Sequence, residues 1–168
     1  MLRYEPWMRR DDAPRTMSRP PGDEALRAIV IYESLTGNTR DAGHLIAEQL
    51  TRSGVEATAS PITAIDLQAL SEAELVIVGS WTDGLFFFGQ RPGRAGRLAR
   101  LPVIDGKKAA VYCTYALDAG RTLEKLAGIV RRRGGDVVGG LAIKRSDLAG
   151  GAVDFVDRLL GVVEPEVA

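Results

Sequence analysis

Six consecutive residues, 34–39, have the side chains and the spacing to hold a phosphate group. The segment follows an apolar run, Ala28–Tyr32, precedes an amphipathic run, 39–50, and reads Ser34-Leu35-Thr36-Gly37-Asn38-Thr39. Its three hydroxyls and the Asn38 amide can donate to phosphate oxygens, and Gly37 lets the backbone approach closely. Where the segment enters a helix, unpaired backbone N–H groups and the helix dipole also favour an anion. The pattern therefore indicates a phosphate-binding loop, with an ordinary helix cap in a polar turn as the alternative.

Apolar runs that alternate with amphipathic segments surround this loop and must position it. Strands are predicted at 28–32, 75–78, 109–113 and 137–143, with an edge strand at 55–61 where apolar and polar residues alternate. Helices are predicted at 39–50, 66–71, 92–100, 122–133 and 148–162. In the last helix, the apolar face is assigned to Val153, Val156, Leu159 and Leu160. This alternation predicts an α/β fold with a parallel sheet covered by helices on both faces.

The motif Ser34-x-Thr36-Gly37-Asn38-Thr39, placed directly after a strand, resembles the phosphate loop of the flavodoxin family, whose members bind flavin mononucleotide (FMN). The resemblance spans about 28–163 and is closest to the short-chain branch. It implies a three-layer sandwich with five parallel strands in the order 2-1-3-4-5 and FMN between the first and third strands. A Walker loop would need a Gly-Lys pair, and a response-regulator receiver would need an acidic cluster where this chain has only Glu33.

A second loop, 79–88, is similar to the first flavin-ring loop of that family. The resemblance implies FMN contacts from five of its residues: Ser80, Trp81, Thr82, Asp83 and Gly84. Trp81 stands at a proline-like position and Asp83 at the usual aromatic one, so either Trp81 or Phe86 is expected to stack on the flavin. Core packing is the alternative for at least one residue of Phe86–Phe88. Gly84 could present a backbone group near flavin N5, and the Asp83 carboxylate should lower the potential of the second reduction step by like-charge repulsion.

A third loop, 113–120, is similar to the second flavin-ring loop. The resemblance implies that Thr114 and Tyr115 contact FMN, with Tyr115 covering the other flavin face. It also implies that the backbone at Ala116 meets the pyrimidine edge and that Gly120 opens the next helix. A half-buried loop aromatic is the alternative for Tyr115.

Four arginines recur every three residues beside the first ring loop: Arg91, Arg94, Arg97 and Arg100. They could form a basic strip for an acidic redox partner or for the phosphates of a nicotinamide nucleotide, with a solvated helix face as the alternative. Cys113 is predicted to be buried and inert, because a reactive thiol needs an exposed, electropositive setting. His44, the only histidine, is predicted to be solvated and unable to form a metal site alone.

Charge and composition limit the classes of partner. The chain has 168 residues, with 22 Lys and Arg against 22 Asp and Glu, so bulk charge does not indicate nucleic-acid binding. A single cysteine and the lack of an apolar run of about 20 residues predict a cytoplasmic protein without a membrane span. Residues 1–24 are polar and proline-rich, so they are expected to form a disordered extension before a domain at 25–168.

Three functions are compatible with these features. The favoured one is an FMN-binding electron carrier that acts between redox partner proteins, a reductase and an acceptor. The alternatives are an FMN-dependent NAD(P)H:quinone or small-molecule reductase, and an interaction module that has lost the cofactor. Fold alone does not separate them.

Overall fold

A parallel sheet forms the centre of the protein in the computed structural model, which describes residues 25–83 and 89–163. Five parallel strands lie in the order β2-β1-β3-β5-β6, and a short sixth strand, β4, pairs antiparallel with the end of β3. The strands are β1 (Arg27–Tyr32), β2 (Glu56–Pro61), β3 (Leu75–Asp83), β4 (Arg91–Pro92), β5 (Lys108–Tyr115) and β6 (Asp136–Lys144). Counted among the parallel strands alone, this is the predicted order 2-1-3-4-5, and β2 is the predicted edge strand.

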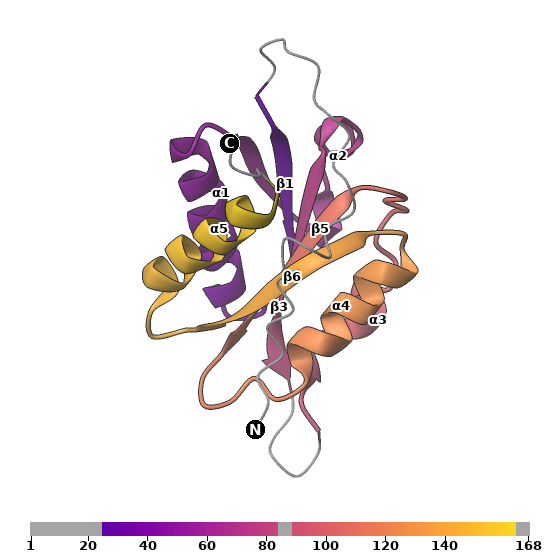
Figure 1. The fold of residues 1–168 in the computed structure, drawn as a ribbon. Coiled ribbons are helices and arrows are strands. Elements are labelled where there is room, and N and C mark those ends of the chain that lie inside the picture. The colour runs from indigo at the N-terminus through magenta and orange to yellow at the C-terminus, as the bar shows by residue number, and fades with distance from the viewer. Residues whose placement is uncertain (1–24, 84–88, 164–168) are drawn as a thin grey trace.

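Helices cover both faces of this sheet (Figure 1). On one face lie α1 (Asn38–Arg52) and α5 (Leu148–Val163), which pack on a core that includes Tyr112 and Phe155. On the other lie α2 (Leu67–Glu72), α3 (Ala95–Leu98) and α4 (Thr122–Arg132), and a 3₁₀ turn follows β2 at Ile62–Ala64. The predicted three-layer α/β sandwich is confirmed.

The predicted helix at 92–100 is wrong in its first half. Pro92 belongs to β4, and the helix begins only at Ala95. Arg94 has a left-handed backbone with φ of 48°, and among the described residues it is the only non-glycine with a positive φ. A helix cannot continue through such a residue. Of the four arginines expected on one helix face, only Arg97 lies within α3.

The apolar face predicted for the last helix is also partly wrong. The structure buries Ala152, Phe155, Val156 and Leu159, whereas Val153 is 42% exposed. Positions 152, 155, 156 and 159 follow the i, i+3, i+4, i+7 spacing of one helix face. Val153 lies outside that face, although its side chain is apolar.

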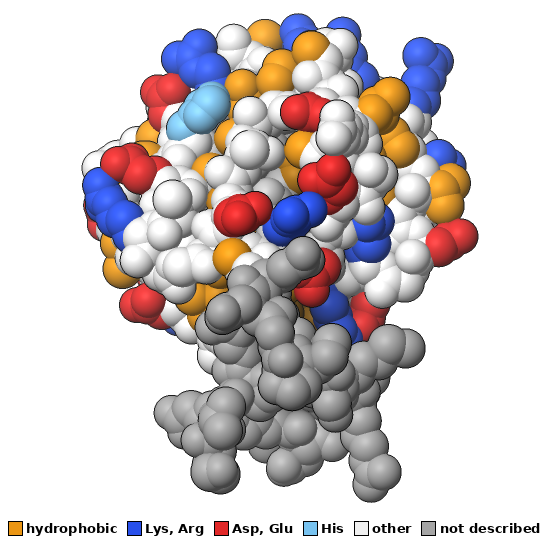
Figure 2. All heavy atoms as spheres, turned by 90° about the horizontal axis from the view of Figure 1, so that it is seen from above, with side chains coloured by type: hydrophobic (Ala, Val, Ile, Leu, Met, Phe, Trp, Pro, Cys, Tyr) orange, Lys and Arg blue, Asp and Glu red, His pale blue; other side chains and the backbone are white. Residues whose placement is uncertain are grey.

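The three loops of interest start at the same edge of the sheet, the lower end in Figure 1, where β1, β3 and β5 end. Tyr32 of β1 pairs with Gly79 of β3, which pairs with Tyr112 of β5. The opposite end of the molecule is seen in Figure 2, where acidic and basic side chains are interspersed and neither sign forms a continuous patch among the coloured residues.

Candidate functional site

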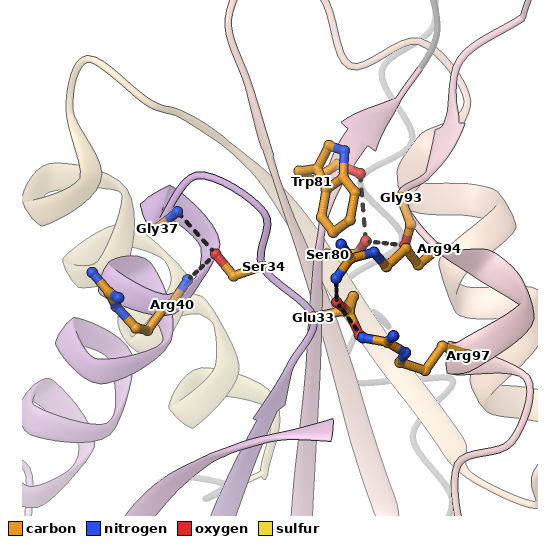
Figure 3. Close-up of polar contacts among 9 residues, drawn as sticks. All are labelled: Glu33, Ser34, Gly37, Arg40, Ser80, Trp81, Gly93, Arg94 and Arg97. Atoms are coloured by element: carbon orange, nitrogen blue, oxygen red, sulfur yellow. Dashed lines mark hydrogen bonds and ion pairs between the residues drawn. The ribbon is translucent and has the colours of Figure 1, made fainter. Parts of the chain in front are cut away.

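The predicted phosphate loop connects β1 to α1 and is closed by the Ser34 side chain. The Ser34 hydroxyl oxygen accepts hydrogen bonds from the backbone N–H groups of Gly37, at 3.2 Å, and Arg40, at 3.3 Å (Figure 3). Gly37 takes a left-handed backbone, with φ of 101°, as the residue before the helix. Ser34 thus replaces the cap side chain that glycine lacks. The backbone N–H groups of Asn38 and Thr39, in the first turn, are the ones that intrahelical bonds leave for a ligand.

Among the remaining residues of the loop, some side chains are exposed to solvent and one is buried in the core. Leu35 and Thr36 are exposed, and the Asn38 amide donates to the Thr36 hydroxyl at 3.3 Å. Thr39 is only 1% exposed. The Arg40 guanidinium, which the sequence motif did not include, lies against Gly37, where an added Cβ would meet its Nη2 atom at 3.1 Å.

Thr39 is clamped to β5. Its hydroxyl shares a 2.8 Å hydrogen bond with the Thr114 hydroxyl, and its backbone carbonyl accepts a 2.8 Å hydrogen bond from the Tyr112 hydroxyl. Tyr112 is fully buried and lies against Gly43 and Gly79, where an added Cβ would come within 2.6 Å and 2.4 Å of its hydroxyl oxygen. Burial, and next the neighbouring Tyr32, raise the pKa of Tyr112, so its hydroxyl stays protonated as a donor. The clamp holds the phosphate loop beside the loop that follows β5.

The first predicted ring loop begins as an extension of β3 that folds back into β4. The Gly93 N–H donates to the Trp81 carbonyl at 2.9 Å, and the Ser80 hydroxyl donates to the Gly93 carbonyl at 3.0 Å (Figure 3). The Trp81 indole lies directly on Gly93, where an added Cβ would be 1.9 Å from an indole carbon. The Arg94 guanidinium carbon is 5.7 Å from the centre of the indole ring. Trp81 is thereby held in one orientation before any ligand binds.

Two further residues of this loop carry polar groups. Asp83 lies 3.7 Å from the Arg91 guanidinium, so its charge has a local partner. The Thr82 hydroxyl oxygen is buried and makes no hydrogen bond of ordinary geometry within the described residues. It lies close enough to the Cys113 thiol to lower the pKa of that thiol slightly, against the larger rise caused by burial. Gly84 and Phe86–Phe88 lie outside the described residues, so their predicted roles are not tested.

The second predicted ring loop follows β5 and is linked to the first through Gln90. Tyr115 and Ala116 are half-buried, and the Tyr115 carbonyl accepts from the Arg145 N–H at 2.9 Å. Gly120 has a φ of 51°, and the Gln90 side chain occupies the place where its Cβ would be. The Gln90 amide also donates to the Asp118 carbonyl at 2.9 Å. Gln90 was not anticipated from the sequence, because no local pattern marks a contact with residues 28 positions away.

A buried acidic residue beside the phosphate loop was also missed. Glu33 is only 3% exposed and accepts hydrogen bonds from Arg94 at 2.7 Å and from Arg97 at 3.1 and 3.2 Å (Figure 3). A buried carboxylate requires such cationic partners. The position of an acidic residue directly after a buried strand was therefore the sequence signal that could have identified Glu33. The predicted basic strip is therefore divided: Arg91 pairs with Asp83, Arg94 and Arg97 pair with Glu33, and Arg100 is exposed.

A pocket of about 270 Å³ opens between the phosphate loop, the end of β2 and this arginine pair. Its polar lining includes Glu33, Ser34, Arg40, Thr63, Arg94 and Arg97. Trp81 and Tyr115, the described aromatic residues of the ring loops, do not line it. The pocket thus lies on the β2 side of the phosphate loop, and Arg94 is the residue that links its wall to Trp81 of the first ring loop.

The predicted burial of Cys113 and the predicted solvent exposure of His44 are confirmed. Cys113 is fully buried, and burial raises the pKa of its thiol to about 12. His44 is exposed, 3.5 Å from the Tyr32 hydroxyl. Within residues 25–83 and 89–163, no group of three or more His, Cys, Asp or Glu side chains could hold a metal ion. In the same part of the chain, no helix is long and apolar enough to cross a membrane.

Several solved structures with the same architecture are flavodoxins. No protein-family model matches the sequence, and neither does any curated protein. A cysteine-to-serine mutant of a flavodoxin from Pseudomonas aeruginosa is 18% identical with a TM-score of 0.64, and the match covers 83% of this chain and 99% of that one. A short-chain flavodoxin associated with a non-canonical PDU bacterial microcompartment is 18% identical with a TM-score of 0.63, with the same coverage. A flavodoxin from the domain Archaea is 21% identical with a TM-score of 0.57, covering 80% of this chain and 99% of that one. The chain therefore has the flavodoxin-like fold.

Proposed function

We propose that this protein binds FMN non-covalently and carries electrons between redox partner proteins. The observation that carries the proposal is the Thr39 clamp, because it fixes the phosphate loop beside the loop after β5, while the sheet register brings Trp81 of β3 next to Thr114. Three loops with different chemistry thus meet at one sheet edge. This is the edge at which open α/β sheets bind their ligands.

The donor groups of the phosphate loop fit a phosphate monoester. The Ser34 hydroxyl accepts two backbone hydrogen bonds, which leaves its own proton available for donation to a ligand. The Thr36 hydroxyl, the Asn38 amide and two backbone N–H groups complete an uncharged donor set. The buried Thr82 hydroxyl, at the end of β3, is a further polar group that a ligand could satisfy.

The ring loops would hold the flavin between aromatic side chains. Trp81, kept in place by Gly93 and Arg94, would form one wall and exclude water, and Tyr115 would form the other. Bound FMN would supply the redox chemistry by accepting and passing on electrons. The protein would contribute binding, orientation and the local charge of Asp83, Arg91 and Arg94.

Titration of the apoprotein with FMN, followed by flavin fluorescence, tests the proposal. We expect saturable quenching with one FMN per chain. The Thr36→Ala and Asn38→Ala variants should each weaken FMN binding by about tenfold or more, because a hydrogen bond to a charged group contributes about 1.5–3 kcal/mol. Riboflavin, which lacks the phosphate, should bind more weakly, and neither variant should affect it. Thr58→Ala, which replaces an exposed threonine on the edge strand β2, is the matched control.

The alternatives give different results in the same preparation. A folded chain that leaves FMN fluorescence unchanged would be the cofactor-less interaction module. An FMN-loaded chain that oxidises NADPH with a quinone, without added reductase, would be the small-molecule reductase. Loading without such turnover supports the electron carrier.

A further inference from the structure

The pocket on the β2 side of the phosphate loop has a net positive wall. Arg94 and Arg97 contribute two guanidinium groups against the single carboxylate of Glu33. Arg40, from α1, adds a third guanidinium; it pairs at 3.0 Å with Asp41, which does not line the pocket. The described lining therefore carries more positive than negative charge, and a concave site with low-dielectric walls concentrates that field.

Glu33 fixes the arginines without using up their donors. All three hydrogen bonds to Glu33 come from Nη1 atoms, one on Arg94 and one on Arg97. Each guanidinium has five N–H donors, so its Nε and Nη2 groups are not needed for the pair. Both side chains remain more than 40% exposed. Because Glu33 already restricts them, a ligand would find two ordered guanidinium groups at reduced entropic cost.

The left-handed backbone of Arg94 is a second indication that the pair of Arg94 and Arg97 forms a ligand site. Its φ of 48° is unfavourable for a residue with a Cβ. Such strain persists where the surrounding structure imposes it, and it clusters at ligand sites. Here the imposed position brings the Arg94 guanidinium to Glu33 and to the pocket wall (Figure 3).

The pocket also has an apolar side. Leu35, Pro61 and Ile62 line it, and Leu35 is 61% exposed. An organic anion, with its charged group on the arginines and its carbon skeleton on these residues, matches this lining better than an inorganic ion. Its volume of about 270 Å³ is just below the usual range of small-molecule pockets, about 300–1,000 Å³, and therefore restricts the ligand to a small one.

We propose that this pocket is a second ligand site beside the FMN site, with the phosphate loop as the wall between them, and that it binds a small organic oxyanion: a phosphate monoester or a carboxylate. Arg94 and Arg97 would bind the oxyanion through paired N–H donors. Arg40 would add attraction from the α1 side. The proposal does not depend on FMN binding, because Arg94 and Arg97, which carry it, are not among the residues predicted to contact FMN.

The test is a calorimetric titration with phenyl phosphate, carried out on the protein as purified and again at saturating FMN. We expect saturable binding that saturating FMN leaves unchanged, weaker binding of inorganic phosphate, and none of phenol. Arg97→Gln should weaken phenyl phosphate binding about tenfold, and Arg97→Lys should restore little of it, because lysine lacks the planar donor pair. Arg132→Gln, which removes an exposed arginine at the end of α4, should bind as the parent does.

Several results would overturn the proposal. Absence of binding, or equal affinity in Arg97→Gln and the parent, would show that the arginine pair is structural. Competition by FMN would show that the pocket belongs to the FMN phosphate site. A short polyglutamate peptide that binds where phenyl phosphate does not would identify a docking surface for an acidic protein. Circular dichroism of each variant confirms folding, and a chain that ignores FMN but binds phenyl phosphate would refute only the proposed function.

Discussion

Replacing Gly79 by alanine would test whether Tyr112 positions the phosphate loop. Gly79 lies in β3 directly beside Tyr112 of β5, and an added Cβ would be 2.0 Å from the phenol carbon that bears the hydroxyl. The backbone of Gly79 is held by β1 and β5 on either side, so the ring must move. Tyr112 is fully buried and packs edge-on against Phe155, with ring centres 6.1 Å apart. Movement of the ring therefore breaks the hydrogen bond to Thr39.

The expected loss of stability follows from three terms. Overpacking a buried site costs about 1–3 kcal/mol. The lost hydrogen bond between Tyr112 and Thr39 costs about 1 kcal/mol. Replacement of glycine reduces the entropy of the unfolded chain and returns about 0.4–1 kcal/mol. The free energy of unfolding of Gly79→Ala should therefore fall by about 2 kcal/mol.

Gly161 supplies a matched control for the same chemical change. It lies in α5 with no atom within 4 Å of an added Cβ, so Gly161→Ala should stabilise the protein by about 0.5–1 kcal/mol. Tyr112→Phe removes only the hydroxyl and should cost about 1 kcal/mol. Urea unfolding without FMN, followed by circular dichroism, gives the unfolding midpoint of each variant. The midpoints can be compared as stabilities if the dependence of the unfolding free energy on urea is the same for all variants.

Two results would refute this reasoning. Equal stability of Gly79→Ala and Gly161→Ala would show that the sheet absorbs the added methyl group without displacing Tyr112. A destabilised but folded Gly79→Ala that binds FMN as tightly as the parent would show that the contact between Tyr112 and Thr39 does not position the loop.

Three further predictions concern single side chains. Arg94→Gln should shift the indole NMR signal of Trp81 and cost more than the roughly 1 kcal/mol of the lost cation–π contact, because it also removes one cationic partner of buried Glu33; an unchanged signal would show that Gly93 alone orients the ring. Cys113, with its pKa raised to about 12 from 9.0, should resist alkylation at pH 8 until the protein unfolds. Because the unfolded thiol loses its proton first, the stability of the parent relative to Cys113→Ala should decline above about pH 9, and a pH-independent difference would contradict this. In FMN-loaded protein, Asp83→Asn should raise the potential of the second reduction step and Arg91→Gln should lower it, because a carboxylate repels the negative charge of the reduced flavin and a guanidinium attracts it. The two side chains lie 3.7 Å apart, so removal of either one leaves the charge of the other uncompensated. Unchanged spectroelectrochemical potentials would refute a role for this pair.

The sheet and most helices could be predicted because their signals are local. Buried parallel strands appear as continuous apolar runs, such as 75–78 and 109–113, and the strands differ from prediction mainly in length. The strand order came from the resemblance, because periodicity does not contain it. The last helix shows the limit of periodicity: its sequence offers apolar residues on two overlapping faces. Packing against the sheet selects the face with Phe155 and exposes Val153.

The segment 91–100 could not be predicted from its spacing because its conformation depends on residues far away in the chain. Arginines at every third position suggested one helix face, but pairing with Thr82 and Asp83 places Arg91 and Pro92 in a strand. Glu33, more than 60 residues earlier, then draws Arg94 and Arg97 together. Neither contact leaves a periodic signal, although a buried acid at a strand end implies that cations must come from elsewhere.

The phosphate motif illustrates how one pattern can serve two purposes. The three hydroxyls and the Asn38 amide were predicted to act alike as ligand donors, yet the structure commits Thr39 to the sheet, through Thr114 and Tyr112. Ser34 is committed in part to the helix start, as acceptor for two N–H groups. The freely exposed donor side chain is Thr36, with the Asn38 amide beside it. Substitutions at Thr39 should therefore change the position of the loop and the stability of the fold, whereas substitutions at Thr36 should change ligand affinity alone.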